Sequence, residues 1–244
     1  MDDTNARGGL KGLVSPDSAL QRAAERLAQQ FAGMVSEETV ERVVFESYTA
    51  LARTAAVSTH LPALAEKFAR DRLVALAQSR GLLAKQVPEI LYVCVHNSGR
   101  SQMAAAITRH LAGDAVHVRS AGSQPTAGLL PDVVAVLTEA GIDVGEEFPK
   151  PLTDDVVRAA DAVVTMGCGD ACPIYPGKRY LDWHIPDPAD LDLDGVRAVR
   201  DEIQRHVERL LIELDPGRHA VRSSTSLPGH RSEHSTIRAP REAR

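Results

Sequence analysis

The residues whose types and spacing best suit catalysis lie around Cys94. This cysteine is near the end of the apolar run Ile90–Val95, and five residues separate it from Arg100. A short loop between a strand and a helix must curl tightly, so its backbone N–H groups form a nest for a tetrahedral oxyanion. Arg100 would add a bidentate contact, and together with the helix dipole it would favour the thiolate of Cys94. The residues expected to bind the anion are Val95, His96, Asn97, Ser98, Gly99, Arg100 and Ser101. The spacing predicts a cysteine nucleophile for phosphate-like oxyanions, and its alternative is a buried strand cysteine before an ordinary turn.

Two more cysteines, Cys168 and Cys172, follow a second predicted strand in a loop that contains glycine. A zinc site would need a second pair of ligands nearby, so we predict no metal. A Cys-x3-Cys loop can bring two Cα atoms within about 7 Å, and three thiols at one sheet edge are what a disulfide relay requires. The alternative is that both are incidental loop residues.

Asp187 lies between two prolines after the last predicted strand, on a stiff turn. A carboxyl group at this place could donate a proton to a leaving oxygen as a general acid. An Asp-Pro turn without a chemical role explains the spacing equally well.

These residues need a scaffold of alternating strands and helices. The loop after Cys94 joins a strand at 90–95 to a helix at 100–112. The other elements are expected as strands at 116–121, 162–166 and 179–183, and as helices at 130–140, 152–160 (capped by Thr153) and 193–214. The alternation predicts an α/β fold with a parallel sheet flanked by helices, whose ligand lies at the carboxyl ends of the strands.

A different pattern occupies the N-terminal third. Residues 1–14 are expected to form a flexible arm, and residues 15–84 a small three-helix bundle whose helices begin near Pro16, Ser36 and Pro62. The bundle has no cysteine and is interpreted as an accessory domain. The catalytic domain is expected at 88–214, and residues 215–244 as a disordered basic tail.

The composition is that of an ordinary globular protein: 244 residues, 43% hydrophobic, 25% charged, with a net charge of −5. Neither nucleic acid nor a membrane is expected as a partner, since the net charge is mildly negative and no apolar run is long enough to span a bilayer. The polar start lacks a secretory signal, so we predict a cytoplasmic monomer with no bound cofactor.

Three segments together resemble a known family: CVHNSGRSQMA, the strand ending VRSAGS, and MGCGDACPIYPGKRYLDWHIPDPA. They are similar, over about residues 88–214, to the low-molecular-weight tyrosine phosphatase superfamily, and within it to the thioredoxin-coupled arsenate reductases. The resemblance implies a low-molecular-weight phosphatase-like fold and the reduction of arsenate to arsenite.

The roles that the resemblance implies start with Cys94, which would attack arsenate held by the loop, Arg100 and Ser101, while Asp187 protonates the departing hydroxyl. Asn97 and Ser101 would brace the loop and stabilise the thiolate. Cys168 would then attack the Cys94 sulfur and release arsenite. Cys172 would take over the disulfide, which thioredoxin would reduce.

The sequence departs from the family pattern at three places. Cys168 and Cys172 are closer together than in the best-known members, Ala105 replaces a glutamate near a cation site, and Gly99 replaces a cysteine. Three alternatives stay open: a mycothiol- and mycoredoxin-coupled arsenate reductase, in which a low-molecular-weight thiol is the reductant; a tyrosine phosphatase, which would not need Cys168 or Cys172; and an oxyanion sensor.

Overall fold

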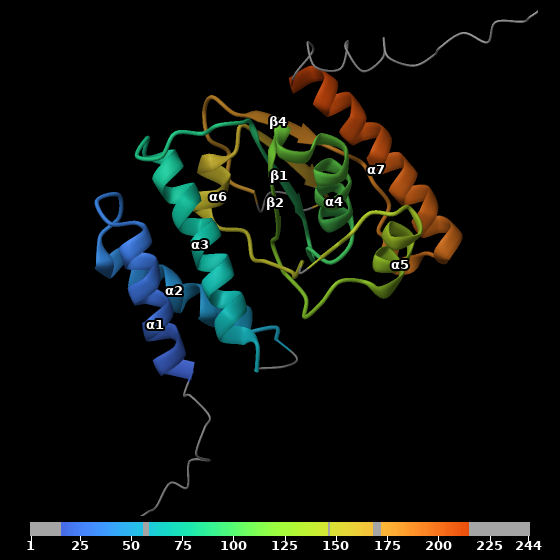
Figure 1. The fold of residues 1–244 in the computed structure, drawn as a ribbon. Helices are drawn as coiled ribbons and strands as arrows, with labels where there is room; N and C mark the ends of the chain where they lie inside the picture. Colours follow the sequence, from blue (N-terminus) through green and yellow to red (C-terminus); the bar gives the residue numbers. More distant parts are fainter. Residues whose placement is uncertain (1–15, 56–58, 146, 168–171, 215–244) are drawn as a thin grey trace, which may run out of the picture.

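The computed structural model describes residues 16–55, 59–145, 147–167 and 172–214 (Figure 1). The predicted N-terminal arm and C-terminal tail, and with them Cys168, lie outside the described residues.

Four parallel strands form the sheet: β1 (Glu89–Cys94), β2 (His117–Gly122), β3 (Ala162–Met166) and β4 (Arg179–Asp182), in the order β2-β1-β3-β4. All six residues of β1 are buried, as expected for a central strand that is covered on both faces. After β1 the chain runs first to one side and then to the other. Such a reversal leaves a crevice at the carboxyl ends of β1 and β3, which is where Cys94 stands.

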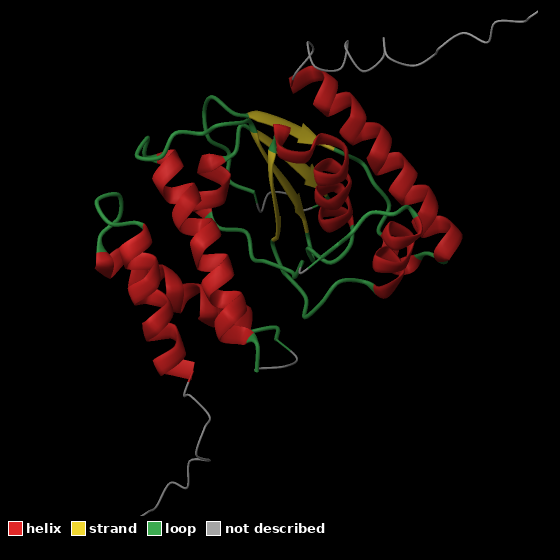
Figure 2. Cartoon of the chain, in the orientation of Figure 1, coloured by secondary structure: helices red, strands yellow, loops and turns green. Residues whose placement is uncertain are grey.

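Helices cover both faces of the sheet, which confirms the predicted α/β fold (Figure 2). One face packs against α4 (Arg100–Ala112), α5 (Pro131–Glu139) and α7 (Leu193–Leu214) through a continuous apolar core. The other face packs against α6 (Asp154–Ala159). The helices at 100–112 and 193–214 have the predicted bounds.

One predicted cap is wrong. Thr153 does precede α6, but its side chain makes no capping hydrogen bond, and its buried Oγ1 has no partner within the described part of the chain. The helix runs from Asp154 to Ala159 and is shorter than the predicted span 152–160. By contrast, the hydroxyl of Ser36 caps the second helix by accepting a hydrogen bond from the Thr39 backbone N–H at 3.3 Å.

Three N-terminal helices, α1 (Pro16–Gln30), α2 (Glu37–Ala52) and α3 (Leu61–Ser79), precede the sheet, as predicted. They share an apolar core, and α3 also packs against α6. Two residues cross between the units: Ala75 of α3 lies in the core beside the sheet, and Phe148 lies in the core of the three helices. The helices are therefore joined to the sheet by shared apolar packing.

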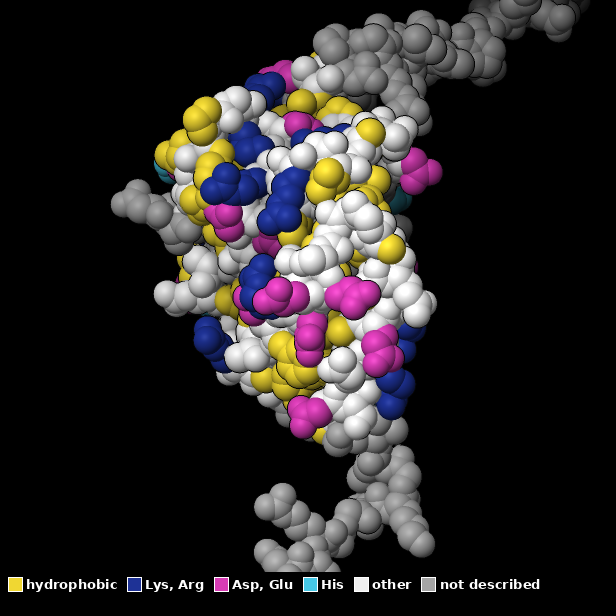
Figure 3. Space-filling model, turned by 90° about the vertical axis from the view of Figure 1, so that its left-hand side faces the viewer, with side chains coloured by type: hydrophobic (Ala, Val, Ile, Leu, Met, Phe, Trp, Pro, Cys, Tyr) yellow, Lys and Arg dark blue, Asp and Glu magenta, His cyan; other side chains and the backbone are white. Residues whose placement is uncertain are grey.

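Polar contacts fix the same junction. The Arg72 guanidinium pairs with Asp155 at 2.9 Å and donates to the Ser47 hydroxyl at 3.2 Å. On the edge strand, Arg119 donates to the backbone oxygen of Asp71 at 2.9 Å. The outer surface on the side of the three helices carries charges of both signs, with basic side chains gathered in its upper part (Figure 3). In the described part of the chain, no helix is long and apolar enough to cross a membrane.

Replacing Arg72 by methionine is expected to lower the free energy of unfolding by about 3 kcal/mol, because the Asp155 carboxylate would stay buried without its cation. Both side chains are about one-tenth exposed. Denaturant unfolding of the full chain measures the effect. Arg42→Met is the matched control, since its pair with Glu46 is exposed and is worth about 0.5 kcal/mol. If the two variants lost the same free energy of unfolding, the Arg72–Asp155 pair would not stabilise the junction between α3 and α6.

Candidate active site

The loop from Val95 to Gly99 turns its carbonyl groups toward the segment 123–130. The carbonyl oxygens of Cys94 and of three loop residues accept hydrogen bonds from backbone N–H groups; the pairs are Ser123 to Cys94, Gln124 to Val95, Thr126 to His96 and Leu130 to Ser98, at 2.8–3.2 Å. With these carbonyls engaged there, the loop backbone lies next to the N-terminus of α4. Binding of an oxyanion in a nest of the loop N–H groups stays a prediction.

Cys94 lies at the base of this nest, 2% exposed. Its Sγ lies 2.9 Å from the Ser101 hydroxyl and accepts a hydrogen bond from the Asn97 backbone N–H at 3.2 Å. Both contacts fix the position of the sulfur at the base of the loop. The structure therefore places Ser101 and Asn97, the two residues expected to stabilise the thiolate, beside Cys94.

Asn97 holds the loop in shape. Its φ of 48° is the positive value that asparagine tolerates better than most residues. The side-chain amide donates to the Ser101 hydroxyl at 2.8 Å, and its oxygen accepts from the Lys150 backbone N–H at 2.8 Å and from the Gln102 amide at 3.2 Å. The buried side chain thus joins the loop to α4 and to the segment around Lys150.

Arg100 and Asp187 meet across the mouth of the loop. The guanidinium pairs with the Asp187 carboxylate at 2.5 Å, with the aspartate side chain about one-third exposed. Two glycines permit this approach. A Cβ at Gly167 would lie 3.0 Å from the guanidinium, and a Cβ at Gly99 would lie 2.8 Å from the ring of Pro188. The Asp-Pro turn therefore lies directly on the Cys94 loop, and the role of Asp187 as a general acid stays a prediction.

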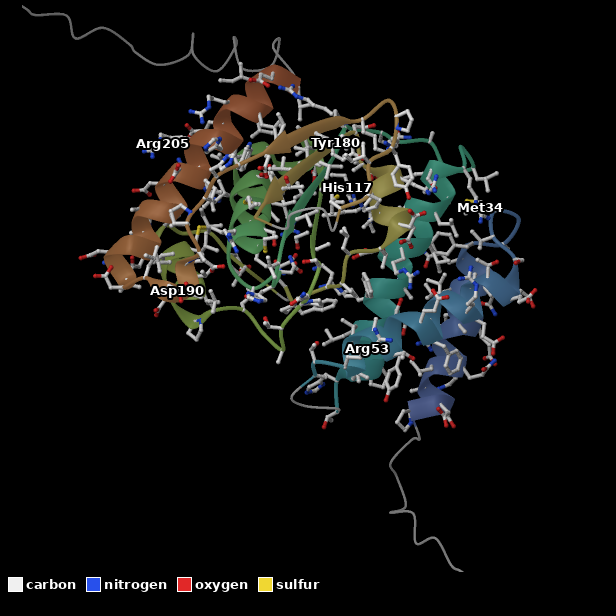
Figure 4. The ribbon with its side chains drawn as sticks, turned by 180° about the vertical axis from the view of Figure 1, so that it is seen from behind. Met34, Arg53, His117, Tyr180, Asp190 and Arg205 are labelled. Carbon is white, nitrogen blue, oxygen red and sulfur yellow. The ribbon has the colours of Figure 1, made fainter. Side chains whose placement is uncertain are left out.

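Cys172 belongs to the segment between β3 and β4 and is half-buried against the core beside α6. Tyr180, labelled on β4 in Figure 4, holds the residues that follow Cys172 in place. The Tyr180 hydroxyl accepts from the Tyr175 N–H at 2.8 Å and donates to the Pro173 carbonyl at 3.1 Å. Burial, and to a lesser degree Cys172, raise the pKa of this tyrosine. The pairing of Cys172 with Cys168 falls outside the described residues and stays a prediction.

Sequence reasoning missed three parts of the site. Lys150 and the Phe148 carbonyl, which accepts from Gln102 at 3.0 Å, come from a stretch without any motif. Gly122 ends β2 so close to the loop that a Cβ would lie 2.7 Å from the Val95 oxygen. Only Gly122 had a signal in the sequence, as a glycine at the end of a predicted strand.

A parallel sheet that carries a cysteine and an arginine on one anion-binding loop defines a phosphatase-type catalytic unit. Residues 89–220 match the family model of the low molecular weight phosphotyrosine protein phosphatases. The chain belongs to this family. Residues 20–77 match the model of the N-terminal domain of protein-tyrosine-phosphatase-like proteins.

Within the family, the similar proteins include arsenate reductases. The solved structure of a Corynebacterium glutamicum thioredoxin-dependent arsenate reductase is 49% identical, has a TM-score of 0.76, and matches over 81% of this chain and 96% of that one. Arsenate reductase 1 of Staphylococcus epidermidis is 36% identical over 127 residues, which is 50% of this chain and 95% of that protein. The arsenate reductase of Bacillus licheniformis is 36% identical over 130 residues, 49% of this chain and 92% of that protein.

Proposed function

We propose that this protein reduces arsenate to arsenite and takes its electrons from thioredoxin. The observation that carries the proposal is the similarity to the thioredoxin-dependent arsenate reductase of C. glutamicum, which extends over four-fifths of this chain. The arrangement of Cys94, Arg100 and Asp187 around an anion-binding loop supports it.

In the first step the Cys94 thiolate attacks the arsenic of an arsenate dianion held by the loop N–H groups and Arg100. An As–S bond forms, and one As–O bond breaks. Asp187 supplies the proton that lets the oxygen leave as water. Because Arg100 contacts Asp187, an oxyanion bound by the guanidinium lies beside the carboxyl group that would protonate it.

In the second step the Cys168 thiolate attacks the sulfur of Cys94. The As–S bond breaks, and its electron pair stays on arsenic, which is thereby reduced from As(V) to As(III) and leaves as arsenite. The cysteine pair is oxidised to a Cys94–Cys168 disulfide. Cys172 then attacks Cys168 and frees the Cys94 thiolate. The dithiol of thioredoxin reduces the resulting Cys168–Cys172 disulfide and closes the cycle.

The test is arsenate-dependent oxidation of NADPH by the full chain with thioredoxin and thioredoxin reductase. Wild-type protein is expected to turn over continuously. Cys172→Ser is expected to stop after one arsenite per chain, because Cys168 can still resolve the arsenic adduct but the disulfide at Cys94 then persists. Cys168→Ser should release no arsenite at all. Mass spectrometry distinguishes the two variants by the trapped disulfide.

Continuous turnover of Cys172→Ser with thioredoxin would overturn the relay. Turnover that appears only when mycothiol and mycoredoxin replace thioredoxin would identify an external thiol as the reductant. Hydrolysis of p-nitrophenyl phosphate without any reduction of arsenate would replace the proposal by the phosphatase function, which needs Cys94, Arg100 and Asp187 alone.

A further inference from the structure

Phe148 contacts both the three N-terminal helices and the surroundings of the Cys94 loop. It comes after α5 in the chain, yet it is 9% exposed and its side chain belongs to the apolar core of α1, α2 and α3. Its carbonyl oxygen accepts a hydrogen bond from the Gln102 amide at 3.0 Å. One residue therefore has its ring in the helical unit and its backbone against α4, the helix that follows the Cys94 loop.

Gln102 continues this connection to the loop. It lies in the first turn of α4, is 1% exposed, and donates from the same amide nitrogen to the Asn97 side-chain oxygen at 3.2 Å. Both groups that face this nitrogen are acceptors, so only the NH₂ end of the amide satisfies them. The Gln102 oxygen has no hydrogen-bond partner among the residues that the structure describes. The contacts with Phe148 and Asn97 therefore orient this buried side chain.

The second donor to Asn97 also depends on Phe148. Lys150, two residues further along the chain, donates its backbone N–H to the Asn97 side-chain oxygen at 2.8 Å. Its ammonium group lies 4.6 Å from the centre of the Phe148 ring and donates to the Phe148 carbonyl at 3.3 Å. A cation is attracted to the face of an aromatic ring. Both groups that hold the Asn97 oxygen are thus anchored on one phenylalanine.

Asn97 in turn contacts the sulfur of Cys94. Its backbone N–H donates to the sulfur at 3.2 Å, and its side-chain amide donates to the Ser101 hydroxyl, which lies 2.9 Å from the same sulfur. A continuous series of buried contacts therefore runs from the helical core through Phe148 and Gln102 to Asn97 and the thiol. Because close-packed interiors have few voids and transmit strain, a displacement of Phe148 is passed on to the loop.

We propose that the three N-terminal helices position the Cys94 loop, and that Phe148 and Gln102 are the residues through which they do so. This role rests on the proposed function, in which Cys94 is the nucleophile. Phe148 and Gln102 are positioning residues, since they act on the thiol through Asn97. A shift of about 1 Å in a catalytic group is enough to slow a reaction markedly. The helices thereby contribute to catalysis as well as to the stability of the junction.

The rate of the first arsenite release per chain tests the proposal. It is measured on the full chain at saturating arsenate, at a temperature where circular dichroism shows each variant folded. Gln102→Leu keeps the volume but loses both hydrogen bonds, and it is expected to lower the rate by about tenfold. Phe148→Ala should lower it by a similar factor. The double variant should lose no more than either single variant, because both changes interrupt the same series of contacts.

Phe31→Ala is the matched control. Phe31 is a second phenylalanine in the core of the three helices and is 2% exposed. Its replacement should lower the stability of the helices much as Phe148→Ala does, because each removes one buried ring from the same core. The rate of arsenite release should stay within about twofold of wild type, since Phe31 is outside the series of contacts that reaches Asn97.

Equal losses of rate in Phe31→Ala and Phe148→Ala would overturn the proposal, because general loosening of the helices would then explain both. A wild-type rate in Gln102→Leu would also overturn it, and this variant decides the question if an alanine variant fails to fold. Wild-type protein that releases no arsenite would instead contradict the proposed function. Hydrolysis of p-nitrophenyl phosphate, which uses the same loop, would then give the same comparison between the variants.

Discussion

Replacing Cys94 by serine is expected to lower the rate of arsenate reduction by about 10³-fold or more, to the level of the assay without enzyme. Serine keeps the contacts with Ser101 and Asn97 but is not ionised at neutral pH, and its oxygen cannot take part in a disulfide. The effect should fall on kcat, because the backbone nest and Arg100 that bind the anion stay in place. The measurement is the NADPH-coupled assay together with phosphate binding by titration.

The pattern across the cysteine variants separates a chemical role from a structural one. Cys94→Ser should show no arsenite burst but near wild-type phosphate affinity and thermal stability. Cys172→Ser should show the burst of one equivalent. A Cys94→Ser protein that still releases one arsenite per chain would remove Cys94 from the proposed mechanism.

Replacing Asn97 by alanine is expected to lower kcat/KM by about 10²-fold, through misplacement of the loop and of the thiol it holds. The free energy of unfolding should fall by about 2 kcal/mol, since the buried Ser101, Gln102 and Lys150 groups lose their common partner. Alanine is also unfavourable at a φ of 48°. Steady-state kinetics and denaturant unfolding measure the two effects.

Asn97→Gly is the control that separates these causes. Glycine adopts a positive φ without strain but lacks the side chain, so it should recover part of the stability and little of kcat/KM. If Asn97→Gly restored full activity, backbone strain alone would explain the defect, and the bracing hydrogen bonds would have no catalytic importance.

The parts of the site that were predictable are those encoded locally. The loop from Cys94 to Ser101 lies between a strand and a helix whose apolar patterns are clear, and the helix at 193–214 has a long amphipathic stripe that fixes its bounds. The fold class followed from the alternation of such elements and is confirmed. The roles of Cys168 and Cys172 rest on the resemblance and stay predictions.

The parts that were missed depend on contacts between distant residues. Lys150 lies 53 positions from Asn97, and its contribution to the loop is a backbone N–H, which every residue except proline has. The side chain of Phe148 is buried in a core whose helical members, Leu20 to Leu73, precede it by at least 75 positions. At Thr153 a residue with a good capping preference makes no capping hydrogen bond, which its local sequence does not indicate.

Phe148 also affects how cooperatively the protein unfolds. Its side chain belongs to the core of the three N-terminal helices, while its own carbonyl is tied to Gln102 beside the oxyanion loop. Separation of the helices from the sheet would expose this ring and the buried Ala75 together. We therefore expect the two units to unfold as one cooperative transition, with a single slope against denaturant that reflects the surface of both.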